Sequence, residues 1–351
     1  MSQELKGFNP NGVGIVGGGF FSLPCSVESS RVVIISAPWD VTVSYGAGTA
    51  AAPEALMEAS SQLDLYDPSA VDAWREGIAT LPVDPAIMEL STTLRPIAER
   101  VISKLESGLE ADQSEINQIN RGSEWLNDNI YNATRNLLQK DKIVALVGGD
   151  HSTPYGAIKA IAEVHESFGI LHIDAHRDLR EAYEGFEFSH ASIMYNVLRD
   201  IEQVEKLVQV GVRDFCDDEQ RLATQSDKIA SFEDMSLARA KFEGETWASQ
   251  CQKIVDALPQ KVYVSFDIDG LDMCYCPHTG TPVCGGLSYN EAVYLLEKVV
   301  ESGRVIIGFD VVEVVPNDES QLDLIVGARV LFKLSGLSII SAEFNLQMQL
   351  N

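Results

Sequence analysis

Three short segments of the sequence concentrate His and Asp side chains at spacings that suit metal binding. They are 148–152 (GGDHS), 174–178 (DAHRD) and 265–272 (SFDIDGLD). In an extended chain, residues i, i+2 and i+4 project to one side, so Asp174, His176 and Asp178 face one way. Carboxylates crowded together without a cation raise one another's pKa. We therefore expect a metal site with the ligands His151, Asp174, His176, Asp178, Asp267 and Asp269.

The number and type of these ligands indicate more than one ion. Mixed imidazole and carboxylate ligands suit Mn, Zn, Fe, Co or Ni. Six ligands exceed what one catalytic ion with an open position for water requires. Two ions about 3.5–4 Å apart, sharing carboxylates and a hydroxide, fit the number better.

The elements that must position these ligands alternate along the chain. Apolar runs typical of buried strands are found at 31–37, 143–147, 169–173, 207–212, 262–266, 305–309 and 338–344. Segments with helical periodicity lie at 94–109, 115–138, 155–167, 193–207, 246–258, 289–302 and 321–334. This alternation predicts an α/β fold with a parallel sheet covered by helices on both faces. The three His/Asp segments follow strands, where open α/β sheets bind ligands, and we expect 66–92 to form a loop or insertion.

The composition narrows the classes of partner. Of 351 residues, 26 are Lys or Arg and 52 are Asp or Glu, a net charge of −26. Such a surface repels nucleic acids and anionic membranes, whereas metal cations and small cationic molecules are compatible with it. We find no targeting signal and no run of about 18 apolar residues. Six cysteines in this context predict reduced thiols and a cytoplasmic location.

The three segments, in this order, resemble the signatures of the ureohydrolases, the family of arginases and agmatinases. The resemblance extends from 41–49 (VTVSYGAGT) to 308–316 (GFDVVEVVP). It implies one ureohydrolase domain over 1–351, with an N-terminal extension at 1–30 and a partly helical insertion within 66–140. It also implies a three-layer arginase-like fold with a central, mostly parallel, eight-stranded sheet, and assembly into homo-trimers or homo-hexamers.

The resemblance assigns roles to individual residues. One ion is held by His151, Asp174, Asp178 and Asp267, and the second by His176, Asp174, Asp267 and Asp269. The ions are usually two Mn²⁺, with Ni, Co, Fe or Zn as alternatives. His190 matches a proton-shuttling histidine, Glu313 the acid that holds the guanidinium, and Thr281 the residue beside it. The sequence departs from the family at Met273, where proline is usual, and the role of the nearby Cys274, Cys276 and Cys284 is open.

The loop between Asp178 and His190 bears on the substrate. Glu181, Glu184 and Glu187 stand where arginases carry a polar loop that binds an α-carboxylate, and such carboxylates attract a terminal ammonium. The pattern is similar to prokaryotic agmatinases, which hydrolyse agmatine to putrescine and urea. Arg180 is counter-evidence, because it could bind a carboxylate. Guanidinobutyrate, guanidinopropionate, guanidine and arginine remain alternative substrates, and a non-catalytic metal-binding protein is the alternative class.

Overall fold

The computed structural model describes residues 3–15 and 17–350, so Met1, Ser2, Val16 and Asn351 of the predicted domain lie outside the described residues. Within the described part, eight strands form one sheet in the order β2-β1-β3-β8-β7-β4-β5-β6, with every neighbouring pair parallel. The strands are β1 Val32–Ala37, β2 Ile78–Thr80, β3 Ile143–Gly148, β4 Phe168–Ile173, β5 Val204–Val210, β6 Ile229–Phe232, β7 Lys261–Asp267 and β8 Val305–Val312.

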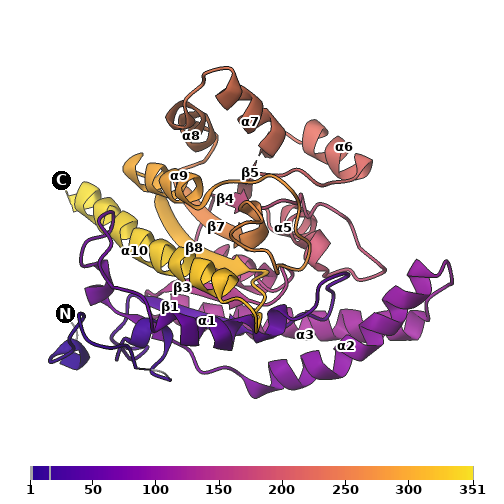
Figure 1. Ribbon diagram of the computed structural model, residues 1–351, viewed down its shortest axis with the longest axis horizontal. Helices are drawn as coiled ribbons and strands as arrows, with labels where there is room; N and C mark the ends of the chain where they lie inside the picture. The colour runs from indigo at the N-terminus through magenta and orange to yellow at the C-terminus, as the bar shows by residue number, and fades with distance from the viewer. Residues whose placement is uncertain (1–2, 16, 351) are drawn as a thin grey trace.

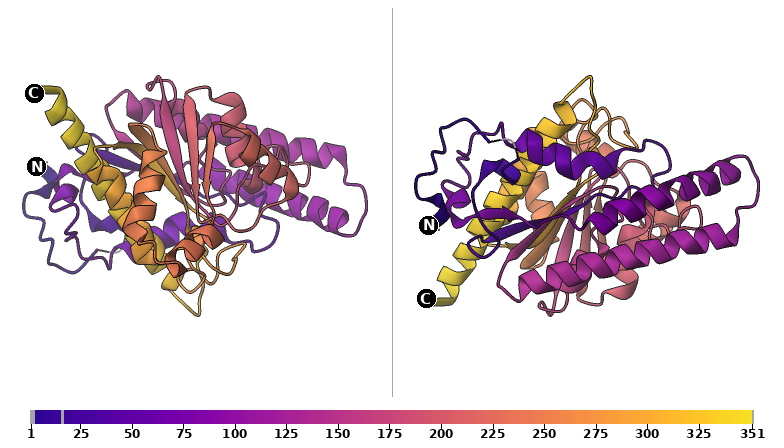
Figure 2. Two further views of the ribbon diagram at one scale, coloured as in Figure 1. Left: turned by 90° about the horizontal axis from the view of Figure 1, so that it is seen from above. Right: turned by 90° about the horizontal axis from the view of Figure 1, so that it is seen from below.

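Helices cover both faces of this sheet (Figures 1 and 2). They are α1 Ala52–Ser60, α2 Pro85–Glu106, α3 Gln113–Leu138, α4 Tyr155–Ile161, α5 Ile193–Asp200, α6 Asp217–Gln225, α7 Asp234–Phe242, α8 Trp247–Asp256, α9 Tyr289–Glu301 and α10 Leu322–Leu350. Alternate residues of β1 separate the two sides. Val32 and Ile34 pack in a core with α1 and α8–α10, whereas Val33 and Ile35 pack in a core with α2 and α3. A third core joins α4 and α5 to β4, β5 and β7. The predicted three-layer α/β fold is confirmed.

The predicted strand at 338–344 is wrong, because this segment continues α10. A short apolar run does not distinguish a buried strand from a buried helix by periodicity. Serine hydroxyls here bond back within the helix: Ser335 donates to the Leu331 carbonyl at 2.7 Å and Ser338 to the Ser335 carbonyl at 2.9 Å. Polar groups that look like strand or turn residues in the sequence are thereby satisfied inside a helix.

The Asp- and Pro-rich segment 66–92 also contains more regular structure than a loop. It includes the 3₁₀ helix Ala73–Glu76, strand β2 at one edge of the sheet, and the first turns of α2. Asp84 caps α2 by accepting a hydrogen bond from the Ala86 backbone N–H at 3.0 Å. Strand β6 at the other edge, and helices α1, α6 and α7, were likewise not predicted.

Helix α10 is long and apolar enough to cross a membrane by length and composition, with mean hydropathy 1.7 over the most apolar 18-residue window within Leu322–Asn345. In the fold, 78% of its most apolar window is buried. Leu331, Leu334 and Leu337 belong to the core between the sheet, α1 and α9. Its hydrophobicity is therefore accounted for by core packing.

Candidate metal centre and cavity

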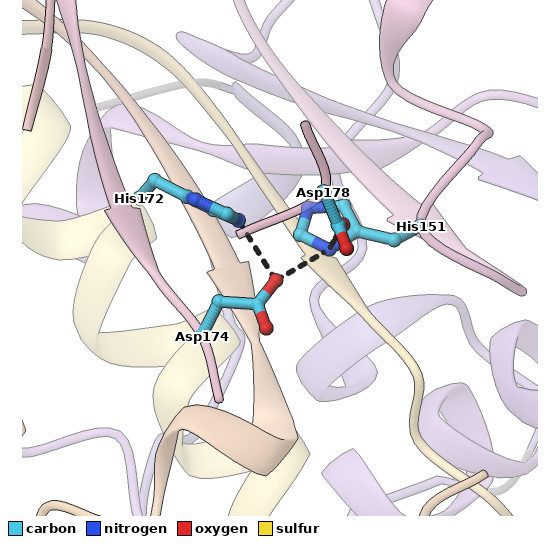
Figure 3. Close-up of side chains that lie close together, drawn as sticks. All are labelled: His151, His172, Asp174 and Asp178. Atoms are coloured by element: carbon cyan, nitrogen blue, oxygen red, sulfur yellow. Dashed lines mark hydrogen bonds and ion pairs between the residues drawn. The ribbon is translucent and has the colours of Figure 1, made fainter. Parts of the chain in front are cut away.

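The His/Asp segments meet at the carboxyl ends of β3, β4 and β7, as predicted. The turn after β3 runs close to other backbone: a Cβ on Gly149 would lie 1.8 Å from the Trp39 carbonyl oxygen, so only glycine fits. This turn presents His151, whose Nδ1 lies 2.9 Å from Asp174, 3.2 Å from Asp178 and 3.1 Å from Asp267. Figure 3 shows His151, Asp174 and Asp178 pointing toward one another.

A second group of ligand-type atoms adjoins the first. His176 Nδ1 lies 3.1 Å from Asp269 Oδ2 and 3.4 Å from Asp174 Oδ1. Asp174 Oδ2 faces His151 instead, so the two oxygens of this one carboxylate belong to two groups. The structure thus brings together all six residues predicted as ligands, arranged as two adjoining sets that share Asp174.

The geometry of these groups fits cations. Among the described residues, His151 Nδ1 and Asp269 Oδ2 are buried atoms without a hydrogen-bond partner, although three carboxylates lie near the first and the His176 imidazole lies near the second. Separations of 2.9–3.2 Å between facing atoms match the roughly 3 Å between neighbouring ligands around an octahedrally coordinated ion with about 2.1 Å bonds. Orphaned buried atoms at such spacings are what a bound cation satisfies.

The electrostatics also indicate missing positive charge. Burial, followed by repulsion from Asp269 and Asp174, raises the pKa of Asp267 well above its ordinary value. Burial and Asp174 raise the pKa of Asp178 to about 6. Burial opposes protonation of His151, but the three carboxylates around Nδ1 raise its pKa well above the ordinary value. Divalent cations remove this repulsion and allow the carboxylates to be ionised at neutral pH.

His172 was not predicted, yet it contacts the same cluster. Its Nε2 lies 2.7 Å from Asp174 Oδ2 (Figure 3). Gln209 Nε2 lies 3.1 Å from the Nδ1 of His172. On the other side, His151 Nε2 lies 2.9 Å from Ser265 Oγ, which donates to Asp310 at 3.1 Å. Such partners orient metal ligands. The position of His172 two residues before Asp174 in β4, on the same face of the strand, is a signal that could have identified it.

Glu313 lies directly after β8 beside the His151 turn. Its backbone adopts φ 61, a conformation uncommon for residues with a side chain. Three hydrogen bonds hold it: Glu313 N–H donates to Gly149 at 2.9 Å, Thr279 Oγ1 donates to the Glu313 carbonyl at 2.8 Å, and His151 N–H donates to Oε1 at 2.8 Å. Burial, then Asp150, raises the pKa of Glu313 well above its ordinary value. Strain concentrates at functional sites, so this geometry supports a functional carboxylate.

A cavity of about 570 Å³ opens onto the cluster at His176 and Asp178. His190 and Thr281, both predicted as site residues, line it. Burial, then the neighbouring His176, lowers the pKa of His190 to about 3, so its imidazole is neutral at physiological pH. The volume suits a small molecule.

The loop glutamates are placed differently from the prediction. Glu181 and Glu184 are not among the residues that line this cavity; Glu181 lines a separate surface hollow together with Glu187. The acidic side chains at the cavity wall are instead Asp214 and Glu219. Tyr183 and Phe186 pair their backbones in a tight turn around Glu184 and a glycine, and the spacing of the glutamates in the sequence does not reveal this turn.

Arg180 also lines the cavity, where it lies 3.7 Å from Glu219 and its guanidinium stacks over the Tyr183 ring at 4.6 Å. Of the cysteines near the site, Cys276 is buried with its thiol donating to the Ile268 carbonyl at 3.2 Å, while Cys274 and Cys284 are exposed. Within the described residues, no cysteine belongs to the metal-binding groups.

Comparison with known proteins matches this arrangement. The model of the Arginase family matches residues 30–336, most of the chain. The chain belongs to the arginase family. It is a ureohydrolase, an enzyme that hydrolyses a guanidino C–N bond, of a family that depends on two metal ions, and the His/Asp cluster could bind metal.

Similar proteins include two kinds of ureohydrolase. The chain is 32% identical over 317 residues to N(1)-aminopropylagmatine ureohydrolase of Thermus thermophilus, covering 90% of this chain and 92% of the other. It is 28% identical to agmatinase of Halalkalibacterium halodurans over 82% of this chain and 85% of the other. The solved agmatine ureohydrolase of Thermoplasma volcanium has a TM-score of 0.69 at 21% identity, covering 99% of both chains. The solved arginase from Medicago truncatula has a TM-score of 0.61 at 23% identity, covering 88% of each chain. These two structural similarities support the fold alone.

Proposed function

We propose that the enzyme hydrolyses agmatine to putrescine and urea with two Mn²⁺. The observation that carries this proposal is the His/Asp cluster at the floor of a cavity whose wall includes Glu219 and Asp214. Agmatine carries a guanidinium at one end and an ammonium at the other. Both charges suit a cavity whose lining includes the carboxylates of Asp178, Asp214 and Glu219.

The six ligands would divide as the family resemblance implies, with Asp174 and Asp267 shared by both ions. The observed sharing of the two Asp174 oxygens supports this division. Bound divalent ions would supply water activation, making a strong nucleophile available near neutral pH. Mixed imidazole and carboxylate ligands are compatible with manganese.

Glu313 would hold the guanidinium. Its Oε1 accepts the His151 N–H, and its Oε2 faces Gly280, where a Cβ would approach to 3.4 Å. Glycine therefore leaves this oxygen room, and a planar guanidinium can donate to it in a charge-assisted hydrogen bond. Thr281 lines the adjoining wall. A cation beside Glu313 also opposes the burial that raises the pKa of this carboxyl, so the bound substrate favours the ionised form.

His190 would carry the proton that the reaction must move. Hydrolysis adds water across the C–N bond, so the oxygen ends in urea and the departing amine gains a proton. A neutral imidazole at the cavity wall can accept a proton and deliver it to the amine.

N(1)-aminopropylagmatine is the second candidate substrate, favoured by the relative at 32% identity that is named for it. The cavity lining includes Asp214, an exposed acid whose charge suits a second ammonium. The positive charge of Arg180 would repel a cationic substrate tail. Glu219 lies 3.7 Å from Arg180 and offsets this charge.

Urea release measured with Mn²⁺ across agmatine, N(1)-aminopropylagmatine, guanidinobutyrate, guanidinopropionate, guanidine and arginine tests the proposal. We expect agmatine or its aminopropyl derivative to have the highest kcat/KM. Arginine or a guanidino acid in first place would refute the cationic-tail assignment. Metal-loaded protein that releases no urea from any of them would favour a non-catalytic metal-binding role.

A cytoplasmic location and assembly as a homo-trimer or homo-hexamer are part of the proposal. The family resemblance supports the assembly. The location is supported by the thiols at Cys216 and Cys251 and at the exposed Cys274 and Cys284, since such thiols are kept reduced in the cytosol. Light scattering of the purified protein tests the assembly.

A further inference from the structure

Helices α2 and α3 form a long antiparallel hairpin across one face of the sheet, and its connecting end projects beyond the strands (Figure 2). The hairpin contributes no metal ligand and no wall residue to the cavity, as far as the described residues show. It nevertheless contacts two loops that meet at His190. We propose that the hairpin fixes the position of His190, with Arg95 and Asn120 as the positioning residues. This inference rests on the proposed role of His190 in catalysis.

Arg95 of α2 holds the first loop. Its Nη1 donates to three backbone carbonyls, those of Asp40 and Val41 at 3.2 Å and that of Val43 at 2.5 Å. The side chain is 16% exposed, so the guanidinium is largely sheltered from competing water. A rigid, permanently charged donor that gathers successive carbonyls fixes the curvature of the segment that contains them.

Thr42 connects this loop to His190. It lies between the carbonyls that Arg95 gathers, and its Oγ1 accepts the His190 backbone N–H at 3.1 Å. The same hydroxyl donates to buried Asp150 at 3.0 Å. The threonine hydroxyl therefore both accepts and donates, which gives it one orientation. Displacement of the 40–43 loop would remove the hydrogen bond to the His190 backbone.

Asn120 of α3 holds the second loop. Its Nδ2 donates to the Gly185 carbonyl at 3.2 Å and its Oδ1 accepts the Glu187 N–H at 3.0 Å. One amide thus binds a loop residue on either side of Phe186, as a neighbouring strand would. Gly185, at φ 82, packs so closely on Ile116 of α3 that a Cβ would lie 2.9 Å from its side chain.

The imidazole of His190 has weak anchors of its own, which makes its backbone position important. Ser189 Oγ lies 3.4 Å from Nδ1 and the Tyr183 ring meets it edge-on at 6.0 Å. A reacting side chain has to be held within about 0.5 Å of its productive position by surrounding contacts. The hairpin acts one step away: it holds the 40–43 loop, which bonds the His190 backbone, and residues 185–187, which lead into His190.

The test compares Arg95→Ala and Asn120→Ala with Arg100→Ala and Asn117→Ala in the Mn²⁺-loaded enzyme. Within the part of the chain that the structure describes, Arg100 bonds only Glu115 and the Pro96 carbonyl, and Asn117 pairs with Gln113. The controls therefore remove hairpin contacts that do not reach the loops. General acid–base catalysis contributes about 100-fold or more. We expect each test variant to lose about 10-fold in kcat with KM within about twofold, and each control to keep kcat.

A double-mutant cycle with His190→Asn separates the inference from the proposed function. If Arg95 acts through His190, Arg95→Ala has no further effect on kcat once His190 is replaced. If the double variant lost kcat by the product of the two single losses, the inference would be overturned. If His190→Asn alone kept full kcat, the proposed role of His190 would be overturned instead.

Amide hydrogen exchange provides a readout that does not depend on activity. Arg95→Ala should increase exchange over 40–46, Asn120→Ala over 185–191, and both should do so at the His190 amide, while the strands of the sheet keep their protection. Unchanged exchange in these loops would show that the hairpin does not hold them and would overturn the inference.

Discussion

Asp267→Asn gives the sharpest test of the metal centre, because the metal-free and metal-loaded proteins should respond in opposite ways. In the metal-free protein, burial and two neighbouring carboxylates raise the pKa of Asp267. A carboxyl whose folded pKa is raised contributes stability that is lost as the pH rises through the raised value. Asparagine stays neutral, so at pH 8 metal-free Asp267→Asn should unfold at the same temperature as wild type or higher.

In the metal-loaded protein the same change should remove stability. An ion at 100 times its Kd stabilises the fold by about 2.7 kcal/mol, and about 2 °C per kcal/mol for a large domain gives a shift of about 5 °C. Mutating a residue that only hydrogen-bonds a metal ligand weakens metal binding by up to about 100-fold. We therefore use about 100-fold as the minimum loss of metal affinity when a direct ligand is replaced. At the same metal concentration the variant then gains only about 0.4 kcal/mol, or about 1 °C.

Scanning calorimetry with and without Mn²⁺, elemental metal analysis and urea release measure these effects. Asp272→Asn is the matched control, because it removes the same charge from the same loop where Asp272 caps the Cys274 N–H at 2.9 Å. If Asp267→Asn lowered the unfolding temperature of the metal-free protein and kept the full Mn²⁺ shift, Asp267 would be a structural residue and the reasoning would fail.

Other residues give independent tests. Glu313→Gln should lower kcat/KM at least about 100-fold with unchanged metal content by elemental analysis; a change confined to metal content would contradict its guanidinium role. Lys333→Ala leaves two carboxylates uncompensated, since buried Lys333 lies 2.6 Å from Asp67 and 3.3 Å from Glu297, and should cost about 3–5 kcal/mol by calorimetry with normal kcat in the folded fraction. Burial raises the pKa of Glu184 to about 7, so wild type should lose stability between pH 5 and 8 and Glu184→Gln should lose less; equal slopes would refute this.

The interior of the fold could be predicted from sequence because its strands are buried on both faces. Such strands form apolar β-branched runs that are visible without context. The edge strands β2 and β6 are three and four residues long, too short for a pattern to stand out. The second half of α10 has the composition of a buried strand, and only its packing against the sheet and α1 decides for helix.

The candidate site was predictable where chemistry and strand spacing coincide. Asp174, His176 and Asp178 lie within five residues, so local geometry groups them. The cavity wall is different, because Asp214 and Glu219 come from the segment after β5 and reach the site only through the order of strands in the sheet. The supports of His190 come from a hairpin more than 60 residues earlier in the chain, and no local pattern connects them.

Backbone conformation is the remaining part of the site that residue types do not reveal. Asp178 and Glu313 adopt φ 53 and 61, which costs of order 1 kcal/mol or more for residues other than glycine. Their surroundings hold them there: the Asp178 carbonyl accepts two backbone N–H groups of α5, and Glu313 is fixed by three hydrogen bonds. In these conformations both carboxylates meet the His151 turn: Asp178 Oδ2 lies 3.2 Å from His151 Nδ1, and Glu313 Oε1 accepts the His151 N–H at 2.8 Å. Glycine at either position would relieve the backbone strain but would remove the carboxylate. Each position therefore carries an acid at a conformational cost, and the reason for that cost is visible only in the folded site.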